Sequence, residues 1–468
     1  MPVTYHSRQT VERAQWIASQ LPKGGLFAGH TWRIAPHPFG LDKRLANQLE
    51  KLGRVLLQFY RAVNLLYRKS AEGKLPPWIA QLLDQGKPNA LIALQRHDSF
   101  RHDLPRIIRP DILLTEEGFS ITELDSVPGG IGLTGWLNQQ YDRLETHFAS
   151  NPTASAESVP VLIGHQDGPV RGFANLFGEA DRIRVIVSDE SSTYRPEMQW
   201  LAEQLRPIKD IEVHDDSFSG FNDGDGVYRF FELFDLDQVR NAQTIFDLAQ
   251  NRRIKLTAPP KAFLEEKLLL GLLWNRNLRE FWRQELGQAF LKTLHQHIPY
   301  TWIIDPTPLP PHAAYPDLGL TDWHQLKSLS QKERRLILKI SGFAPQAWGA
   351  RGVHLGSDLS TEAWRAAVDR AIQAFPSNPY ILQPYKKPRI VESQWVDLNH
   401  QEAQTMKGRV RLCPYYFVVG EGDQARVRLG GCLATICPAD KKIIHGMTDA
   451  IIAPCSVHEA ATQPHQPT

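Results

Sequence analysis

The sequence predicts a mixed α+β protein with more than one lobe, and three observations support this fold class. Residues 41–95 carry apolar side chains at three- and four-residue intervals, which is typical of amphipathic helices. Residues 107–126 have the pattern of a strand, a glycine-containing turn and a second strand. Between residues 158 and 230, β-branched runs alternate with a helical pattern, which indicates a small α/β unit with a parallel sheet. With 468 residues, 42% of them hydrophobic, the chain can bury one sizeable core or two.

The helical region comes first, in "LDKRLANQLEKLGRVLLQFYRAVNLLYRKS". A coiled-coil partner surface is the alternative reading, but Gly53 and the irregularly spaced aromatic residues favour packing within the chain. The hairpin follows as "IIRPDILLT", "EEG" and "FSITELDS". His102 and Asp103 lie directly before it, where we favour a capped turn over a contact to substrate.

The α/β unit begins after the polar linker "NPTASAESVP" and includes "VPVLIGHQ", "RIRVIV", "DIEVHD" and "GDGVYRFFEL". Residues 261–300 return to helix. A proline-rich linker, "DPTPLPPHAAYP", then precedes the strand "RRLILKI" and the small-residue loop "SGFAPQAWGARGVHLG". A helix, a strand and two long β-rich segments complete the order. Residues 456–468 have the composition of a disordered tail.

Charge and composition argue against several classes of partner. Lys and Arg number 53 against 51 Asp and Glu, a formal charge of +2, so no global field marks a nucleic-acid or membrane-surface binder. No run of about twenty consecutive apolar residues occurs. We therefore expect a soluble, cytoplasmic protein. The cysteines (Cys413, Cys432, Cys437 and Cys455) form no C-x-x-C pair, which favours reduced, mostly buried thiols over a structural zinc site.

The hairpin carries an unusual set of charges in "RPDILLTEEGFSITELDSVPGG". Side chains two apart on a strand share a face, so Arg109 and Asp111 point one way together, as do Glu123 and Asp125. If the strands pair, three carboxylates converge, and oxygen ligands favour a hard ion such as Mg²⁺. Arg109 would serve the anion that this ion bridges, most simply a phosphate. Spacing alone leans slightly toward the alternative, a solvated hairpin face with exposed ion pairs.

A second cluster surrounds Lys339. This lysine lies near the end of a strand, where its ammonium can reach a ligand, and Gly342, Gly349 and Gly352 allow close backbone approach. Arg351 supplies a second cation. The loop matches neither the P-loop nor the dinucleotide-binding glycine pattern. A glycine-containing surface loop with an outward-reaching lysine explains it equally well.

Two further features are ambiguous when taken singly. Lys267 lies in the strongly apolar "FLEEKLLLGLLW", which we expect to be a helix, and it needs a partner if it faces inward. The strand "KGRVRLCPYY" puts Arg409 and Arg411 on one face, suited to an anion or to the acidic hairpin.

Taken together and in this order, these segments resemble the circularly permuted ATP-grasp proteins, the group that includes glutathionylspermidine synthase. The clearest likeness is R-x-D, a glycine turn and E-x-[ND]. It continues through "GVYRFFEL", "EEKLLLGLLW", "IPYTW", the lysine loop, "YILQPY" and "GRVRLCPYYFV". The resemblance implies an ATP-grasp fold in permuted order, with the metal hairpin ahead of the lysine-bearing lobe. The expected units are a helical region (1–104), the metal hairpin (105–150), a pre-ATP-grasp-like α/β subdomain (158–260), the ATP-grasp lobes (261–455) and the tail (456–468).

The resemblance also implies a reaction and a set of site residues. The reaction is ligation of a small-molecule or peptide carboxylate to an amine or another nucleophile, driven by ATP and Mg²⁺ through an acyl phosphate. The implied residues are Asp111, Glu123 and Asp125 for Mg²⁺, Lys267, Lys339, Arg351 and Gln383 for the nucleotide, and Arg109 and Arg411 at the transferred phosphate.

The sequence departs from the family pattern at two places. Asp125 stands where asparagine is commoner, and the loop after Lys339 contains the bulky residues Phe343, Pro345 and Trp348. The bulky loop favours the alternative function, a non-catalytic nucleotide- or partner-binding protein, whereas the retained acidic set favours the ligase. No counterpart of a fused amidase domain is present, which argues against a bifunctional enzyme.

Overall fold

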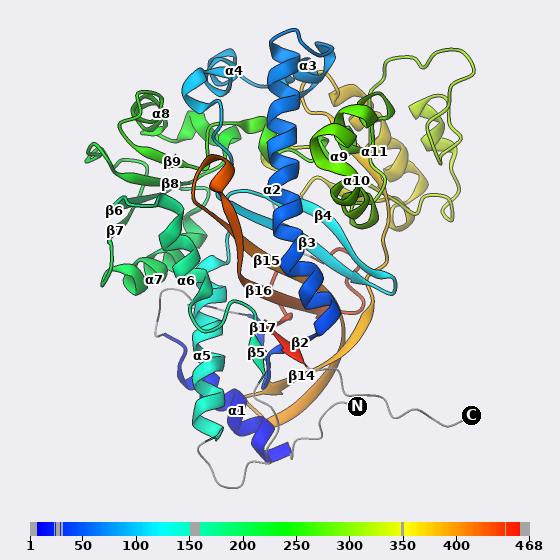
Figure 1. The fold of residues 1–468 in the computed structure, drawn as a ribbon. Coiled ribbons are helices and arrows are strands. Elements are labelled where there is room, and N and C mark those ends of the chain that lie inside the picture. The colour runs from blue at the N-terminus through cyan, green and yellow to red at the C-terminus, as the bar shows by residue number, and fades with distance from the viewer. Residues whose placement is uncertain are drawn as a thin grey trace.

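The computed structural model describes residues 7–22, 24, 29, 31–149, 160–347, 351–444 and 446–458. Within these ranges the chain folds around three sheets, one of nine strands and two of four, with helices packed between and around them (Figure 1). The mixed α+β class that the sequence predicts is confirmed.

The nine-stranded sheet lies at the centre of the molecule (Figure 1). Its main path is β1-β17-β16-β15-β3-β4, with β14 paired to β15 and with β2 and β5 paired to β17. The short strands β1 and β2 run parallel to β17, and the other pairs are antiparallel. The strands are β1 (Arg33–Ile34), β2 (Phe39–Asp42), β3 (Ile107–Thr115), β4 (Gly118–Asp125), β5 (Val161–Leu162), β14 (Ile390–Asp397), β15 (Glu402–Val419), β16 (Arg426–Pro438) and β17 (Ile451–His458).

Helices cover both faces of this sheet. Alternate residues of β15 point to opposite sides: Leu412 and Tyr416 join one core with α2, α9 and α10, and Cys413 and Tyr415 join another with α1, α5 and α6. Asp42 caps the long helix α2, because its carboxylate accepts from the Leu45 N–H at 2.7 Å. The helices of this part are α1 (Ser7–Ser19), α2 (Lys43–Ala71), α3 (Trp78–Asp84), α4 (Asn89–Arg96), α5 (Ile131–Ala149), α6 (Gly168–Ala174), α9 (Leu268–Trp274) and α10 (Arg279–His297).

The expected α/β unit is present as a four-stranded parallel sheet in the order β7-β6-β8-β9. One face packs through α7 against the core that contains α5, and the other packs against α8. The buried, β-branched β6 supplies side chains to both faces. The elements are β6 (Arg182–Val187), α7 (Arg195–Leu205), β7 (Asp210–His214), β8 (Gly226–Phe230), α8 (Ala242–Gln250) and β9 (Lys255–Thr257).

A third, antiparallel sheet has the order β10-β13-β11-β12 and packs against α11. Its core centres on the fully buried Trp364, whose indole N–H donates to the Leu326 carbonyl at 2.8 Å. Ser360 caps α11 by accepting from the Ala363 N–H at 3.1 Å. The elements are β10 (Trp302–Ile303), β11 (Leu336–Ile340), β12 (Val353–Leu355), α11 (Thr361–Ala374) and β13 (Tyr380–Pro384).

Several details differ from the sequence-based expectation. The run Val161–Leu162 pairs with β17 in the large sheet instead of joining the parallel sheet. The region expected to be helical also contributes β1 and β2 to the large sheet. The strand β17 extends to His458, so residues 456–458 of the expected tail are strand, while 459–468 lie outside the described residues.

All four cysteines are buried and free, as expected. No helix among the described residues is long and apolar enough to cross a membrane.

Candidate functional site

The β3–β4 hairpin forms as predicted and sets four charged residues opposite one another. Its register pairs Arg109 with Asp125 and Asp111 with Glu123, and a register shift follows directly after Asp111. The Arg109 guanidinium lies between two carboxylates, with Nε 3.2 Å from Asp111 and Nη2 2.9 Å from Asp125. Arg109 Nη1 also donates to the Gly129 carbonyl at 3.2 Å, which ties the hairpin to the glycine pair that follows it.

Arg411 approaches the same carboxylate from the neighbouring strand. Because β15 pairs with β3, Arg411 lies opposite Leu113, and its Nη1 is 3.1 Å from Asp111 Oδ2. Asp111 is buried, and its carboxylate lies between the guanidinium groups of Arg109 and Arg411. Burial raises the pKa of Asp125, although Arg109 acts in the opposite direction. Arg409 turns to other partners, the Ala439 carbonyl and the Tyr385 hydroxyl.

Two lysines reach the hairpin from other parts of the chain. Lys267 is buried, and its Nζ lies 2.6 Å from Glu123 Oε1. It directly precedes α9 instead of lying within a helix, which corrects the expected placement. Lys339 is buried on β11 and donates to the Thr122 carbonyl at 3.0 Å. Burial lowers the pKa of Lys339 to about 8, with Glu123 acting in the opposite direction.

The last two expected residues flank Lys339. Gln383 lies on β13 opposite Ile337, is buried, and donates its amide to the Thr301 hydroxyl at 2.8 Å. Arg351 lies in the loop before β12 and is half-exposed, with its guanidinium 3.6 Å from Glu190. The loop is anchored at its start, because the Ser341 hydroxyl donates to Glu266 at 2.8 Å. Its central residues 348–350, which include Trp348 and Gly349, lie outside the described residues.

All nine sequence-predicted site residues line one cleft of about 460 Å³. They come from β3, β4, β11, β13, β15 and the two loops at Lys267 and Arg351. The cleft therefore gathers residues that are up to about 300 positions apart in the sequence, since the Arg411–Asp111 contact spans that separation. The residues are Arg109, Asp111, Glu123, Asp125, Lys267, Lys339, Arg351, Gln383 and Arg411.

Sequence reasoning missed other residues of the cleft, among them Ser191, Tyr194 and Glu232. All three follow the carboxyl ends of parallel strands: Ser191 and Tyr194 follow β6, and Glu232 follows β8. That edge of a parallel sheet is where α/β folds place ligands, so the strand pattern itself was the available signal. Burial raises the pKa of Glu232 to about 8, with Glu265 and Asp125 adding to the rise.

The carboxylates of the cleft fit a Mg²⁺ ion only if phosphate oxygens supply part of its coordination shell. Among the described residues, no three His, Cys, Asp or Glu side chains gather closely enough to hold a metal ion by themselves. The ion usually takes one or two protein carboxylates and completes its shell with water and substrate phosphate oxygens. Asp111 and Glu123 lie opposite each other on the hairpin and offer two such carboxylates.

The fold and the cleft define a mixed α+β protein whose site is rich in cations and also bears carboxylates. Comparison with solved structures shows which known proteins have a similar fold. No family model and no curated protein matches the sequence. A glutathione synthetase-like effector from Globodera pallida, solved in its apo form, matches over 98% of this chain and 99% of its own, with a TM-score of 0.59 and 11% identity. A putative γ-glutamylcysteine synthetase from Methylobacillus flagellatus matches over 85% and 88%, at 11% identity and a TM-score of 0.40.

The first match extends over nearly the whole of both chains, so this protein has the fold of a glutathione synthetase-like protein. This match supports the structural resemblance that the motifs suggested, and it concerns the fold alone. At 11% identity the match carries no further conclusion about activity, and the second match is too weak to add to it.

Proposed function

We propose that this protein is an ATP- and Mg²⁺-dependent ligase that joins a carboxylate to an amine or another nucleophile. The observation that carries the proposal is the pairing within the cleft. Each acidic hairpin residue that lines the cleft is held by a cation: Asp111 by Arg109 and Arg411, Asp125 by Arg109, and Glu123 by Lys267. A phosphate chain brings the anions that these cations need, and Mg²⁺ brings the charge that the freed carboxylates need. Binding of the two together lets Asp111 and Glu123 exchange their cations for Mg²⁺. Asp125 stays beside Arg109, whose guanidinium has donors for both this carboxylate and a phosphate.

The residues have distinct tasks in such a reaction. Lys267 and Lys339 neutralise phosphate charge, while Arg109 and Arg411 steady the phosphoryl group during transfer. The substrate carboxylate attacks the γ-phosphorus, ADP leaves, and the nucleophile then displaces phosphate from the acyl phosphate. When bound, Mg²⁺ draws charge from the phosphate oxygens, and Asp111 and Glu123 are the residues placed to hold it.

Gln383 and Arg351 complete the proposed nucleotide set. Gln383 is fixed by Thr301 beside the strand that carries Lys339, so it contributes to nucleotide position rather than to charge. Arg351 is half-exposed at the cleft edge, which suits a residue that closes on phosphate after binding. The chain order, with the acidic hairpin ahead of Lys267 and Lys339, supports the permuted arrangement, in which the parallel-sheet unit is of pre-ATP-grasp type.

The second candidate is a protein that binds a nucleotide or a partner without ligation. Two observations favour it: the bulky loop after Lys339, and the description of the structural neighbour as an effector. The cleft carboxylates are also paired with cations of the chain itself, as a non-catalytic protein would allow.

Calorimetric titration with ATP, with and without Mg²⁺, tests both candidates. We expect Mg²⁺-dependent binding that Glu123→Gln weakens roughly tenfold or more, because the variant removes one charged ligand. The matched control is Glu392→Gln, an exposed strand glutamate paired with Lys407 at 3.7 Å in the same sheet. Unchanged Mg²⁺-dependent binding in both Glu123→Gln and Asp111→Asn would remove the basis of the proposal. Phosphate release with candidate acids and amines then separates a ligase from a binder.

A further inference from the structure

A second cavity, of about 810 Å³, shares no lining residue with the cleft. Its walls come from the second half of α2, the segment that leads into β3, the end of α8 with β9, and the turn between β15 and β16. Eight lysines and arginines line it against three carboxylates, a formal charge of +5, while the whole chain carries +2. The cations are Arg61, Arg68, Lys69, Lys74, Arg101, Arg106, Arg252 and Lys255.

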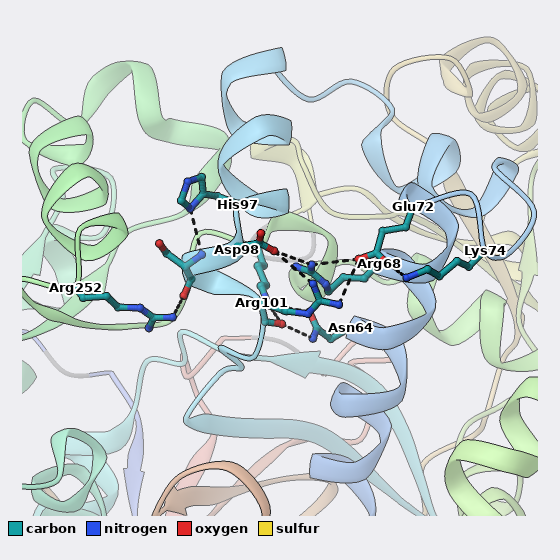
Figure 2. Close-up of polar contacts among 10 residues, drawn as sticks. Asn64, Arg68, Glu72, Lys74, His97, Asp98, Arg101 and Arg252 are labelled. Atoms are coloured by element: carbon teal, nitrogen blue, oxygen red, sulfur yellow. Dashed lines mark hydrogen bonds and ion pairs between the residues drawn. The ribbon is translucent and has the colours of Figure 1, made fainter.

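Arg68 and Arg101 form the centre of this charge (Figure 2). Both guanidinium groups contact Glu72 and Asp98, at N···O distances between 3.3 and 3.5 Å. Charge-assisted bonds of this kind are normally about 2.7–2.9 Å long, so these are loose. The Asp98 side chain is 84% exposed, and the best contact of Glu72 is to Lys74 at 2.7 Å. The local acids therefore do not fully engage the two arginines.

Three buried guanidinium nitrogens strengthen this point. Arg68 Nε, Arg68 Nη1 and Arg106 Nε have no hydrogen-bond partner among the described residues. Buried N–H groups without acceptors cost free energy, and native proteins rarely leave them so. The fork of an arginine matches the geometry of carboxylate and phosphate oxygens. An anion in the cavity would add negative charge beside these under-satisfied guanidinium groups.

A buried lysine braces one side of the cavity. Lys261 is fully buried below it, with Nζ 2.8 Å from both Asn64 Oδ1 and the Asp103 carbonyl. Asn64 in turn donates to the Arg101 carbonyl at 3.0 Å, which holds the arginine-bearing turn against α2 (Figure 2). Arg252 lies on the far side of that turn from Arg68 (Figure 2). Its guanidinium donates to the Ser99 carbonyl and lies 3.7 Å from Asp103. Cations thus stand on two walls of the cavity.

Apolar side chains line the cavity together with the charged ones. Leu57, Leu65, Phe100, Phe177 and Leu256 belong to the lining. A bare inorganic ion would leave this surface in contact with water, whereas an organic ligand would cover it.

We propose that this cavity binds a small organic polyanion, with at least two phosphate or carboxylate groups on an apolar body. The charges would bind Arg68 and Arg101 on one wall and Arg252 or Lys255 on the other. This inference does not rest on the proposed ligase activity, because the cavity and the cleft have separate linings.

Calorimetry with two probes, pyrophosphate and citrate, tests the proposal on the full chain without Mg²⁺. Pyrophosphate represents phosphorylated ligands and citrate represents polycarboxylates. We expect at least one probe to bind and Arg101→Gln to weaken its binding at least tenfold, with Lys74→Gln causing a smaller loss. Arg283→Gln is the matched control, because Arg283 is a similarly exposed arginine in another surface hollow, and it should leave probe binding unchanged.

Lys339→Met separates the cavity from the cleft, because it removes a cleft cation and none from the cavity. Binding that persists in Lys339→Met and is lost in Arg101→Gln supports the proposal, and the better probe identifies the anion class. Absence of binding by both probes, or binding lost in Lys339→Met and kept in Arg101→Gln, overturns it. Arg101→Gln, on a half-exposed turn, is preferred to Arg68→Gln because Arg68 is largely buried in α2 and its removal risks unfolding the helix.

Discussion

Lys339 provides the most specific pH prediction for the cleft. Burial lowers its pKa to about 8, so the ammonium is mostly charged at pH 7 and mostly neutral at pH 9. If only the charged form holds a phosphate, the dissociation constant for ATP scales as one plus the ratio of neutral to charged lysine. That factor is about 1.1 at pH 7 and about 11 at pH 9, so affinity falls about tenfold, or about 1.4 kcal/mol.

Glu232 adds to the effect in the same direction. Burial raises its pKa to about 8, so it gains a negative charge over the same pH interval and in the same cleft. Calorimetric titrations of ATP at pH 7, 8 and 9, in constant excess Mg²⁺, measure the combined loss. The nucleotide phosphates are already largely ionised over this range, so the change reports on the protein.

Two conservative variants divide the pH dependence between its sources. Lys339→Arg keeps its charge at every pH used, and Glu232→Gln never acquires one. Each should flatten the profile in part, and the double variant should show almost no dependence between pH 7 and pH 9. An equally steep profile in the double variant, or a flat profile in the wild type, would refute the assignment of Lys339 to a phosphate.

Three further outcomes are expected. Lys87→Met removes the cation paired with Glu266 in a site where both side chains are at most 3% exposed, so the unfolding free energy should fall by about 3–5 kcal/mol in urea titrations. The double variant Lys87→Met/Glu266→Gln should recover most of this loss. The surface variant Lys407→Met should change the unfolding free energy by less than about 0.5 kcal/mol. Gly86→Ala should destabilise by about 2 kcal/mol more than Gly73→Ala. Both glycines have positive φ, but only at Gly86 would a Cβ meet the Ser377 carbonyl, at 1.9 Å. Asp125→Asn should keep Mg²⁺-dependent ATP affinity within about fivefold of wild type in the same calorimetric assay, because an asparagine oxygen still accepts from the Val127 N–H. Asp111→Asn should weaken ATP binding by more than this.

The sequence was most informative where local pattern and side-chain chemistry coincide. The hairpin could be predicted because period-two alternation and a glycine turn are local signals. The partners of Arg109 and Asp111 could not be predicted from the turn, because a register shift directly after Asp111 changes the pairing that the turn begins. The helix α2 could be predicted because its apolar positions repeat over its whole length.

Long-range packing explains what was missed. Val161–Leu162 is too short for its pattern to show which sheet it joins, and its pairing with β17 is set about 300 residues later in the chain. Lys267 was placed on a helix because its neighbours are apolar, but the helix begins one residue later. The basic cavity was not visible at all, because Arg68 and Arg252 come together only through the packing of α2 near the parallel-sheet unit. Contacts between such distant positions leave no periodic trace in one sequence.

Asp125 gives the hairpin one more negative charge than the pattern of the proteins that the motifs resemble. The register sets Asp125 opposite Arg109, and its carboxylate lies 2.9 Å from that guanidinium and accepts from the Val127 N–H at 2.9 Å. The extra negative charge is therefore matched within the hairpin and adds none to the metal position. Asp111 and Glu123 remain as the facing pair, and two protein carboxylates are what Mg²⁺ needs when phosphate oxygens supply the rest of its shell. A compensated charge at Asp125 therefore favours the proposed ligase over the alternative of a non-catalytic binding protein.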